Sequence, residues 1–393
     1  MAAQNSYFST WRFRMSDSIS VSPGWLEKSV GSVFTAAGLS PSAAGKVAAG
    51  LVEADLRGTP SHGVMLVPMY VERLRKGSVS THETADVVHD AGAIAVLDAR
   101  HALGQLTGDQ AMTLAVDKAR AHGIGAVAVR RAFHFGGAYR YARLAASAGC
   151  IGIAAANTRP LMPAPGGAAA VVGNNPLAVG VPREHGAPIL LDMALSQAAL
   201  GKIRLAAQEG RPIPPTWATD RTGTPTTDPT EALVGLLLPA AGHKGYGLAL
   251  VVDILTGVLS GGGYGGGVRG LYADTSAPND CAHFFLALDV SAFGDSAGFE
   301  ERVTTLAGQI TGSPKAPNTE RLLLPGQLEA ERQDTARRTG VPLDRSVLAA
   351  LRGTAASVGV EIGDPAVPRR GEPRLDEPRT PGPGRFRSDS TPT

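Results

Sequence analysis

The sequence is poor in cysteine and has no closely paired histidines. Its two cysteines, Cys150 and Cys281, lie far apart in apolar stretches. Two cysteines supply neither a disulfide framework nor a thiolate metal site, so we expect two buried free thiols. The nine histidines include no close pair at the spacing of metal ligands. We therefore expect no structural zinc site, no metalloprotease site and no bound metal.

Long apolar runs and a marked excess of one charge are also absent. The longest apolar run, 245–259, carries Asp253 and is too short to span a bilayer. The first residues, 1–15, lack the apolar core of a secretory signal. Lys and Arg total 37 against 35 Asp and Glu, which gives no reason to expect a nucleic-acid partner. These absences predict a cytoplasmic protein with neither a membrane nor a nucleic acid as partner.

The sequence does contain enough apolar material for a large core, since 43% of its residues are hydrophobic. Pro, Arg, Gly and Ser become dominant only near the C-terminus, where we expect disorder. One folded unit is predicted over 21–362. The expected parts are an irregular leader 1–20, a helical part 21–80, an α/β core about 85–290, C-terminal helices 296–360 that pack back, and a disordered tail 363–393.

Helices and strands are predicted to alternate along the core. Ser22-Pro23 and Ser40-Pro41 each combine an N-cap residue with proline in the first turn, so helices should begin there and end near Ala37 and Gly58. Further helices are expected at 67–76, 105–122, 139–148, 197–208, 244–259, 327–339 and 345–357, and strands at 93–97, 126–129, 151–156, 189–191 and 284–288. This order favours an α/β fold with a mixed sheet.

The glycine-rich stretches do not form a dinucleotide fingerprint of the Rossmann type. The nearest approach, 123–128, precedes a predicted strand, whereas the Rossmann glycine loop follows a strand and opens a helix. The stretch 261–267 has no strand before it, and we interpret it as a flexible surface loop or lid. If a dinucleotide binds, another architecture must hold it.

Ser61-His62-Gly63 follows the second helix and is the first candidate for chemistry. A histidine there can change protonation near neutral pH and exchange a proton with a substrate oxygen. Ser61 can orient the ring, and Gly63 leaves space for a ligand. The alternative is a capping serine beside a surface histidine.

His134-Phe135-Gly136-Gly137 joins a predicted strand to the helix that contains Tyr139. Free N–H groups at a helix start, with glycines that allow close approach, predict a phosphate seat. A tight strand-to-helix turn is the alternative.

Two further segments have ligand-binding character. Asp192 follows a predicted strand, where its carboxylate can orient a histidine or simply stabilise the next helix start. Gly242–Gly247 also opens a helix, and its adjacent His243 and Lys244 between glycines suit a loop that faces a ligand.

Taken together and in order, these motifs resemble the malate/L-lactate/ureidoglycolate dehydrogenase family, which includes sulfolactate dehydrogenases and piperideine-carboxylate reductases. The resemblance covers about residues 25–360. The matching segments are 52–58, 61–64, 134–136, 157–158, 164–167, 175–176, 191–194, 201–203, 225–229, 242–247 and 324–326. The resemblance implies a mixed-sheet α/β fold peculiar to this family (sulfolactate dehydrogenase-like, not Rossmann), NADPH or NADH as cofactor, a small-molecule substrate and a homodimer.

The resemblance also implies roles for individual residues. The catalytic residues would be Ser61, His62 and Asp192. The cofactor would contact His134, Phe135, Gly136, Gly137, Asp192, Met193, Ala194, His243, Lys244, Leu324, Pro325 and Gly326. The substrate would contact Leu66, His134 and Thr158. The implied reaction is hydride transfer between nicotinamide and a carbonyl or imine carbon, with His62 as proton donor or acceptor.

Two positions depart from the family pattern. Leu66 stands where the family commonly has an arginine that faces the substrate carboxylate, and Ala132 stands where it commonly has a serine. Loss of a bidentate guanidinium places an ordinary 2-oxo acid substrate in doubt. Neither Arg57 nor Arg73 is expected to replace it, since Arg57 should contact the carbonyls at its helix end. The alternatives are a reductase of cyclic imines or specialised metabolites, and a non-catalytic dinucleotide-binding homologue.

Overall fold

The computed structural model describes residues 18–366, and its N-terminal part is a helical layer. It consists of α1 (Pro23–Ala36), α2 (Pro41–Leu56) and α3 (Val67–Lys76), each with proline in its first turn. The Ser40 side chain accepts a hydrogen bond from Ala43 N and caps α2 as the sequence predicts. Two late helices, α10 (Gln327–Thr339) and α11 (Arg345–Ser357), pack against α2 and α3 respectively.

A mixed sheet of seven strands follows the helical layer, in the order β2-β3-β4-β10-β5-β8-β9. β3 and β4 run parallel, and the other neighbours run antiparallel. The bounds are β2 Asp86–Ala91, β3 Ile94–Asp98, β4 Ile124–Ala132, β5 Cys150–Ala156, β8 Leu177–Val181, β9 Ile189–Met193 and β10 Cys281–Asp289. The predicted α/β class and mixed sheet are confirmed.

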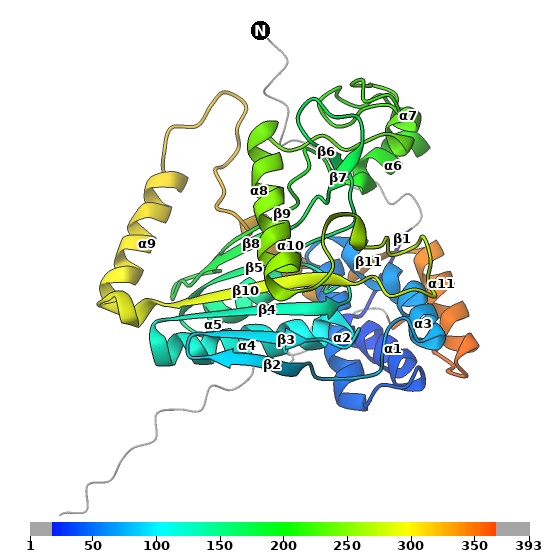
Figure 1. Ribbon diagram of the computed structural model, residues 1–393, viewed down its shortest axis with the longest axis horizontal. Coiled ribbons are helices and arrows are strands. Elements are labelled where there is room, and N and C mark those ends of the chain that lie inside the picture. Colours follow the sequence, from blue (N-terminus) through cyan, green and yellow to red (C-terminus); the bar gives the residue numbers. More distant parts are fainter. Residues whose placement is uncertain (1–17, 367–393) are drawn as a thin grey trace, which may run out of the picture.

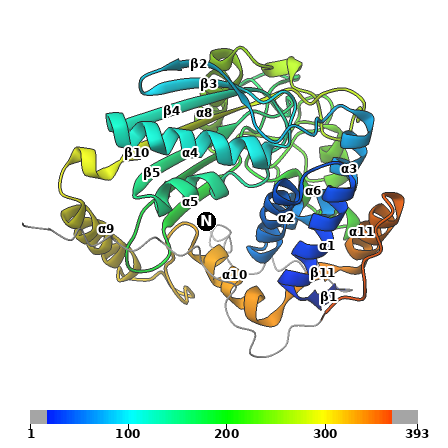
Figure 2. The same cartoon turned by 90° about the horizontal axis from the view of Figure 1, so that it is seen from below.

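Helices cover the two faces of this sheet unequally. α4 (Gly104–His122) and α5 (Tyr139–Ser147) cover one face (Figure 2). α8 (His243–Asp253), continued by a π-helical turn Ile254–Val258, lies across the other face (Figure 1). A Cβ at Gly152 in β5 or at Gly180 in β8 would overlap the Ala142 carbonyl of α5. Glycine therefore allows α5 to approach the sheet closely, which fixes the turn that precedes α5.

A smaller lobe rises beside α8 and has its own apolar cluster around Ile203 and Trp217. It contains the hairpin β6 (Met162–Pro163) and β7 (Ala170–Val172) with α6 (Leu200–Gln208) and α7 (Pro229–Val234). Both cysteines are buried and free, as predicted.

The chain ends differ from the expectation. Ser18–Val21 form β1, which pairs with β11 (Val341–Asp344), so the irregular leader predicted for 1–20 is wrong for 18–20. Ser22 N donates to Ala366 O at 2.8 Å, so the disorder predicted from 363 onward is wrong for 363–366. Both contacts join segments from opposite ends of the chain. The composition of either segment alone does not predict such a contact. The remaining predicted leader and tail, 1–17 and 367–393, lie outside the described residues.

The C-terminal helices also differ among themselves. We expect all of them to pack back onto the core, and α10 and α11 do so. α9 (Ser296–Thr311), in contrast, buries only Ala307 and stands apart from the body of the molecule in both views (Figures 1 and 2). Leu306 and Ile310 on this helix are exposed. The helix therefore presents apolar side chains that this chain does not cover.

Candidate functional site

His62 lies in a short loop between α2 and α3. Pro60–His62 and Val64–Leu66 form two 3₁₀ turns joined by Gly63. The Ser61 hydroxyl lies 3.0 Å from His62 Nδ1, so the predicted contact of serine and histidine is present. His62 is partly exposed, and desolvation by the surrounding protein lowers its pKa. An imidazole that water can reach is suited to exchange protons with a bound molecule.

Asp55, in the last turn of α2, holds this loop in place. Its buried carboxylate accepts a hydrogen bond from Val64 N at 2.8 Å. A Cβ at Gly63 would overlap the same carboxylate, so glycine is required there. Burial raises the pKa of Asp55 to about 7, while the hydrogen bond from Val64 opposes the rise. The Asp55 side chain therefore changes charge close to neutral pH, directly beside the His62 loop.

The second histidine, His134, lies in the turn between β4 and α5. Gly136 in this turn has a left-handed backbone, with φ at +78°. The Tyr141 hydroxyl donates to Phe135 O at 2.5 Å. Gly104, at the start of α4, approaches so closely that a Cβ there would lie 2.7 Å from the His134 carbonyl. Contacts from α4 and α5 thus fix the backbone around His134.

The structure brings the two histidines together. The imidazoles of His62 and His134 stack with centroids 5.4 Å apart and planes inclined by 24°. Tyr70 of α3 contributes its hydroxyl, which lies 2.5 Å from His134 Nδ1. Burial, followed by the nearby His62 and His283, holds the pKa of His134 well below its usual value. A positive charge on one imidazole disfavours a positive charge on the other. The pair therefore favours states in which at most one of the two rings is positively charged.

Asp192, which the sequence groups with Ser61 and His62, contacts a different part of the site. Its Oδ2 accepts a hydrogen bond from Tyr139 N at 3.1 Å, in the first turn of α5. Within residues 18–366, no hydrogen bond joins Asp192 to Ser61 or His62. The side chain is open to solvent, yet the protein that surrounds it raises its pKa to about 6. The carboxylate is thus open to solvent and yet surrounded by enough protein to be partly desolvated. This combination indicates a position in a recess of the surface.

This contact changes the role expected for the start of α5. The sequence predicts a phosphate seat at His134–Gly137, because N–H groups are free at a helix start. Here the positive end of the helix already holds the Asp192 carboxylate. A phosphate placed beside it would meet a like charge. The turn is better suited to an uncharged part of a ligand.

Two other predicted cofactor segments meet along β9. Leu190 N donates to Pro325 O at 2.9 Å, so the segment 324–326 pairs with the strand that ends in Asp192 and Met193. Gly326 has φ at +81°, and a Cβ there would lie 2.7 Å from Leu190 Cβ. Glycine is required at this position for both reasons.

His243 and Lys244, also predicted to contact the cofactor, open α8. Both side chains are exposed, and Gly242 at the N-cap offers no side chain to cap the helix. Ala240 N donates to Leu195 O at 2.9 Å, which places this helix start beside the segment that follows β9. Two basic side chains at an uncapped helix start favour binding of phosphate.

The two remaining predicted substrate contacts lie in different surroundings. Thr158 is partly buried, and its hydroxyl donates to Asn174 Oδ1 at 2.9 Å. Its backbone N–H donates to Asn175 Oδ1 at 2.9 Å. Leu66 is only 2% exposed and belongs to the apolar cluster of the N-terminal helices. Leu66 therefore offers a carboxylate no polar partner.

Neither nearby arginine takes the place of an arginine at Leu66. Arg73 is fully buried and donates to the carbonyls of Leu271 and Ala277, both at 2.8 Å. Arg57 donates to Gln333 Oε1 at 3.0 Å and lies over the ring of Tyr139. The expected contact of Arg57 with helix carbonyls is therefore wrong, because the side chain turns toward α10 instead.

The glycine-rich stretch 261–267 is fastened to the core, which corrects the expected flexible loop. The Asn157 side chain donates to Gly263 O at 2.8 Å and to Asp253 Oδ1 at 2.9 Å. Gly265 N donates to Asp253 Oδ2 at 3.0 Å. Asn157 and Asp253 are both buried, so this polar network closes the loop over the end of β5.

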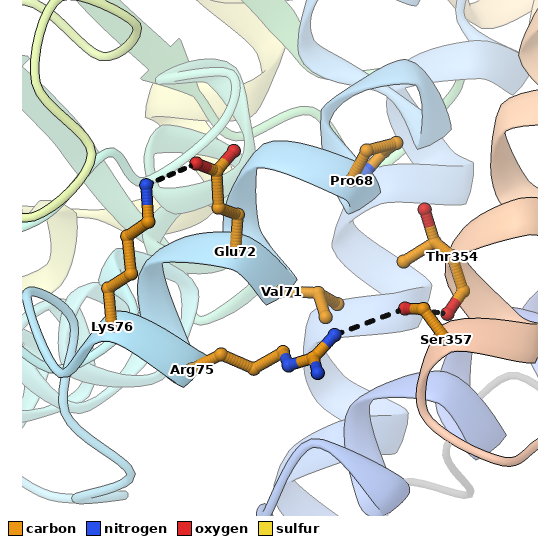
Figure 3. Close-up of a pocket in the computed structure, with 7 residues that line it drawn as sticks. All are labelled: Pro68, Val71, Glu72, Arg75, Lys76, Thr354 and Ser357. Carbon is orange, nitrogen blue, oxygen red and sulfur yellow. Dashed lines mark hydrogen bonds and ion pairs between the residues drawn. The ribbon is translucent and has the colours of Figure 1, made fainter.

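A surface pocket lies between α3 and α11 (Figure 3). Its α3 residues occupy the helix face opposite Tyr70 and Arg73. Lys76 pairs with Glu72 at 2.7 Å. The lining residues are Pro68, Val71, Glu72, Arg75, Lys76, Thr354 and Ser357. None of them is a predicted site residue, so the histidine pair remains the candidate centre.

Comparisons with known proteins match most of the described fold. The family model for malate/L-lactate dehydrogenase matches residues 21–352. A malate dehydrogenase of Pyrococcus horikoshii is 39% identical over 337 residues, which cover 84% of this chain and 92% of the relative. Sulfolactate dehydrogenase from Methanocaldococcus jannaschii superposes with a TM-score of 0.83 at 34% identity, over 88% of this chain and 98% of that chain. Δ1-Piperideine-2-carboxylate reductase from Pseudomonas syringae superposes with a TM-score of 0.76 at 28% identity, over 86% and 100%.

Proposed function

This chain belongs to the malate/L-lactate dehydrogenase family of oxidoreductases, and we propose that it transfers a hydride between a nicotinamide dinucleotide and a carbonyl or imine carbon. The dinucleotide, when bound, supplies or accepts the hydride. His62 gives a proton to the developing alkoxide or amine, and takes it back in the reverse direction. Ser61 orients the His62 ring through the contact at Nδ1.

The stacked pair of His62 and His134 is the observation that carries this proposal. Reduction of a carbonyl or imine needs one proton donor beside the carbon that receives the hydride. His62 is partly exposed and can reach a bound molecule, whereas most of the surrounding helical layer is apolar. Asp192 adds a titratable carboxylate at the start of α5, with a pKa raised to about 6 by the surrounding protein.

The residues present fit a dinucleotide at two separate places. The uncapped start of α8, with His243 and Lys244, suits its phosphates. The turn His134–Gly137 suits the uncharged nicotinamide end, because Asp192 already neutralises the start of α5. We expect NADH or NADPH to bind in this manner.

Fluorescence titration with NADH and NADPH tests the cofactor assignment. Lys244→Ala should weaken binding about tenfold, the usual effect of losing a hydrogen bond to a charged group. Lys46→Ala, at an exposed lysine of α2, is the matched control and should leave the affinity unchanged. Absence of saturable binding of either dinucleotide below about millimolar would refute the assignment.

The substrate should lack a carboxylate at the position that Leu66 occupies. A charge against the buried Leu66 side chain has no partner, and an uncompensated charge in an apolar site is costly. We therefore expect poor activity with malate, lactate and sulfolactate. A wild-type kcat/KM above about 10⁴ M⁻¹s⁻¹ for pyruvate or oxaloacetate, an ordinary enzyme value, would contradict this argument.

Leu66→Arg, with Leu66→Met as a matched control of similar volume, sharpens the same test. If the new guanidinium creates activity with 2-oxo acids, position 66 sets the specificity of this chain. Because Leu66 is buried, thermal unfolding of both variants must accompany the kinetics.

A cyclic-imine or specialised-metabolite reductase is the second candidate within this class. The apolar Leu66 and the structural similarity to a piperideine-carboxylate reductase favour including cyclic imines in the kinetic panel. A non-catalytic homologue is the alternative from another class. Tight dinucleotide binding without turnover of any carbonyl or imine would support that alternative.

We also propose a homodimer, because two separate helical segments expose apolar side chains. α8 and its π-helical extension present a row of exposed aliphatic side chains, and α9 presents more. These residues are Leu248, Val251, Ile254, Val258, Leu259, Leu306 and Ile310. Exposed patches of this kind usually mark an interface.

Light scattering of the full chain tests the dimer. Leu306→Glu combined with Ile310→Glu should shift the mass from dimer to monomer, whereas Glu301→Gln on the same helix should not. A wild-type protein that is monomeric at micromolar concentration would contradict the proposal.

A further inference from the structure

Tyr70 is fully buried in α3 and joins two polar side chains from other elements. Gln105 of α4 donates from Nε2 to Tyr70 Oη at 3.2 Å. Tyr70 Oη in turn lies 2.5 Å from His134 Nδ1. The Tyr70 ring also packs edge-on against His134, with centroids 6.1 Å apart. A continuous chain of hydrogen bonds therefore runs from α4 through α3 to the imidazole.

The direction of these hydrogen bonds follows from the chemistry of the groups. The amide nitrogen of Gln105 can only donate, so the phenol oxygen of Tyr70 accepts at that contact. The single phenol proton has two acceptors within reach, His134 Nδ1 at 2.5 Å and His134 O at 3.5 Å. The shorter contact favours Nδ1 as the acceptor, which then offers its lone pair. A neutral His134 consequently carries its proton on Nε2.

We propose that Tyr70, oriented by Gln105, is a positioning residue that holds His134 as a neutral ring with its proton on Nε2. His62 is then the histidine of the pair that exchanges protons with the substrate. The inference rests on the proposed function for this division of roles, but the state of His134 can be measured without any substrate.

The titratable groups around His134 agree with a neutral ring. They are His62 on the stacked side, Tyr70 of α3, and His283 of β10. Burial lowers the pKa of His283 to about 3, so that ring is neutral and offers no negative charge. The phenol of Tyr70 is also neutral, because burial raises its pKa. None of these three neighbours stabilises a positive charge on His134.

A fixed Nε2–H donor beside His62 has a direct use. It can hydrogen-bond to an oxygen of the substrate or to the carboxamide of a nicotinamide without giving up its proton. A second mobile proton at this place would compete with the one on His62, since the two rings stack at 5.4 Å.

Nitrogen NMR of the full chain labelled with ¹⁵N-histidine tests the tautomer directly. His134 resonances are assigned by comparison with His134→Gln. In the wild type, Nε2 should be protonated and Nδ1 unprotonated from pH 6 to 8. In Tyr70→Phe, the tautomers should mix and the pKa of His134 should rise. A wild-type His134 that is protonated on Nδ1 would overturn the proposal.

Kinetics separate positioning from a general structural effect. Tyr70→Phe should lower kcat about tenfold and move the acidic limb of the pH profile upward, because protons now reach His134. Tyr141→Phe removes another buried hydroxyl, which bonds to the backbone of the same turn, and should leave that limb in place. If the acidic limb of the pH profile lies at the same pH in Tyr70→Phe and Tyr141→Phe, Tyr70 has only a structural role.

The two hypotheses can fail separately. If the protein turns over no carbonyl or imine, the proposed function fails while the NMR result still decides the state of His134. If Tyr70→Phe does not fold, Gln105→Leu offers a milder change, and it should mix the tautomers in the same direction.

Discussion

The loops that carry His62 and His134 are fixed to different degrees. The His62 loop is held by the buried Asp55 carboxylate, which accepts from Val64 N, and by Thr59, which donates to Ala54 O at the end of α2. The His134 turn is held by two tyrosine hydroxyls, those of Tyr70 and Tyr141, and by close packing of α4. In the proposed mechanism the mobile proton belongs to His62, whose ring has, among the described residues, no partner comparable to Tyr70. Asp55, whose pKa burial raises to about 7, then supports the loop of the histidine that we propose exchanges protons.

The most damaging change to this arrangement should be His62→Ala. Removal of a positioned acid typically lowers the rate about 10²–10⁴-fold. Dinucleotide affinity should be retained, because the phosphates are assigned to the start of α8. Steady-state kinetics and fluorescence titration of the same preparation check both parts. A variant with nearly wild-type kcat on its best substrate would show that another group donates the proton.

Gly63→Ala should have the next largest effect. The new methyl group would overlap the Asp55 carboxylate and push the His62 loop away from it. Displacement of a catalytic group by about 1 Å can lower activity about 10²-fold. Gly45→Ala in α2 meets no atom within 4 Å and serves as the control, with unchanged activity expected. Equal activity of the two variants would mean that the loop position does not matter.

Asp55→Asn should change how stability depends on pH. The folded-state pKa of about 7 lies above the ordinary 3.8, so the native state binds this proton more tightly than the unfolded state. Its contribution is fully present below about pH 4 and is lost as the pH rises through about 7. Asparagine, which can still accept from Val64 N, should remove up to about 4 kcal/mol of this pH dependence.

Urea unfolding at several pH values measures this slope. Asp117→Asn, at an exposed aspartate of α4, is the control and should leave the wild-type slope unchanged. If Asp55→Asn instead leaves the slope of the free energy of unfolding between pH 4 and 7 as it is in the wild type, the pKa of Asp55 is not raised in the folded state.

Local sequence signals were sufficient for most helices and for the class of the fold. Caps with proline located α1 and α2, and glycine ended α3 and α4 where expected. β2 was missed because all its residues are exposed, and β8 because it is a short run that contains Gly180. β1 and β11 could not be predicted, since each exists only through pairing with the other end of the chain.

The site was predictable at its motifs but not at the residues that support them. Ser61 and His62 stand out as neighbours in a loop, and the structure joins them. The supporting residues lie on helices, where helical spacing predicts only that a side chain is packed in the core. These residues are Tyr70, Gln105 and Asp55. The contact of Asp192 with the start of α5 was not foreseen, because this carboxylate comes from a strand 53 residues later. Capping by a residue distant in sequence leaves no local signal.

Transfer of deuterium from C4 of the reduced dinucleotide tests the central claim most directly. NADH and NADPH deuterated at C4 would each be incubated with a panel of 2-oxo acids, neutral ketones and cyclic imines, and the products examined by mass spectrometry. We expect one carbon-bound deuterium in the preferred product, and no label in the product formed by His62→Ala after the same time. A chain that binds the dinucleotide tightly but labels no product would contradict it, and would identify a binding protein built on an enzyme fold.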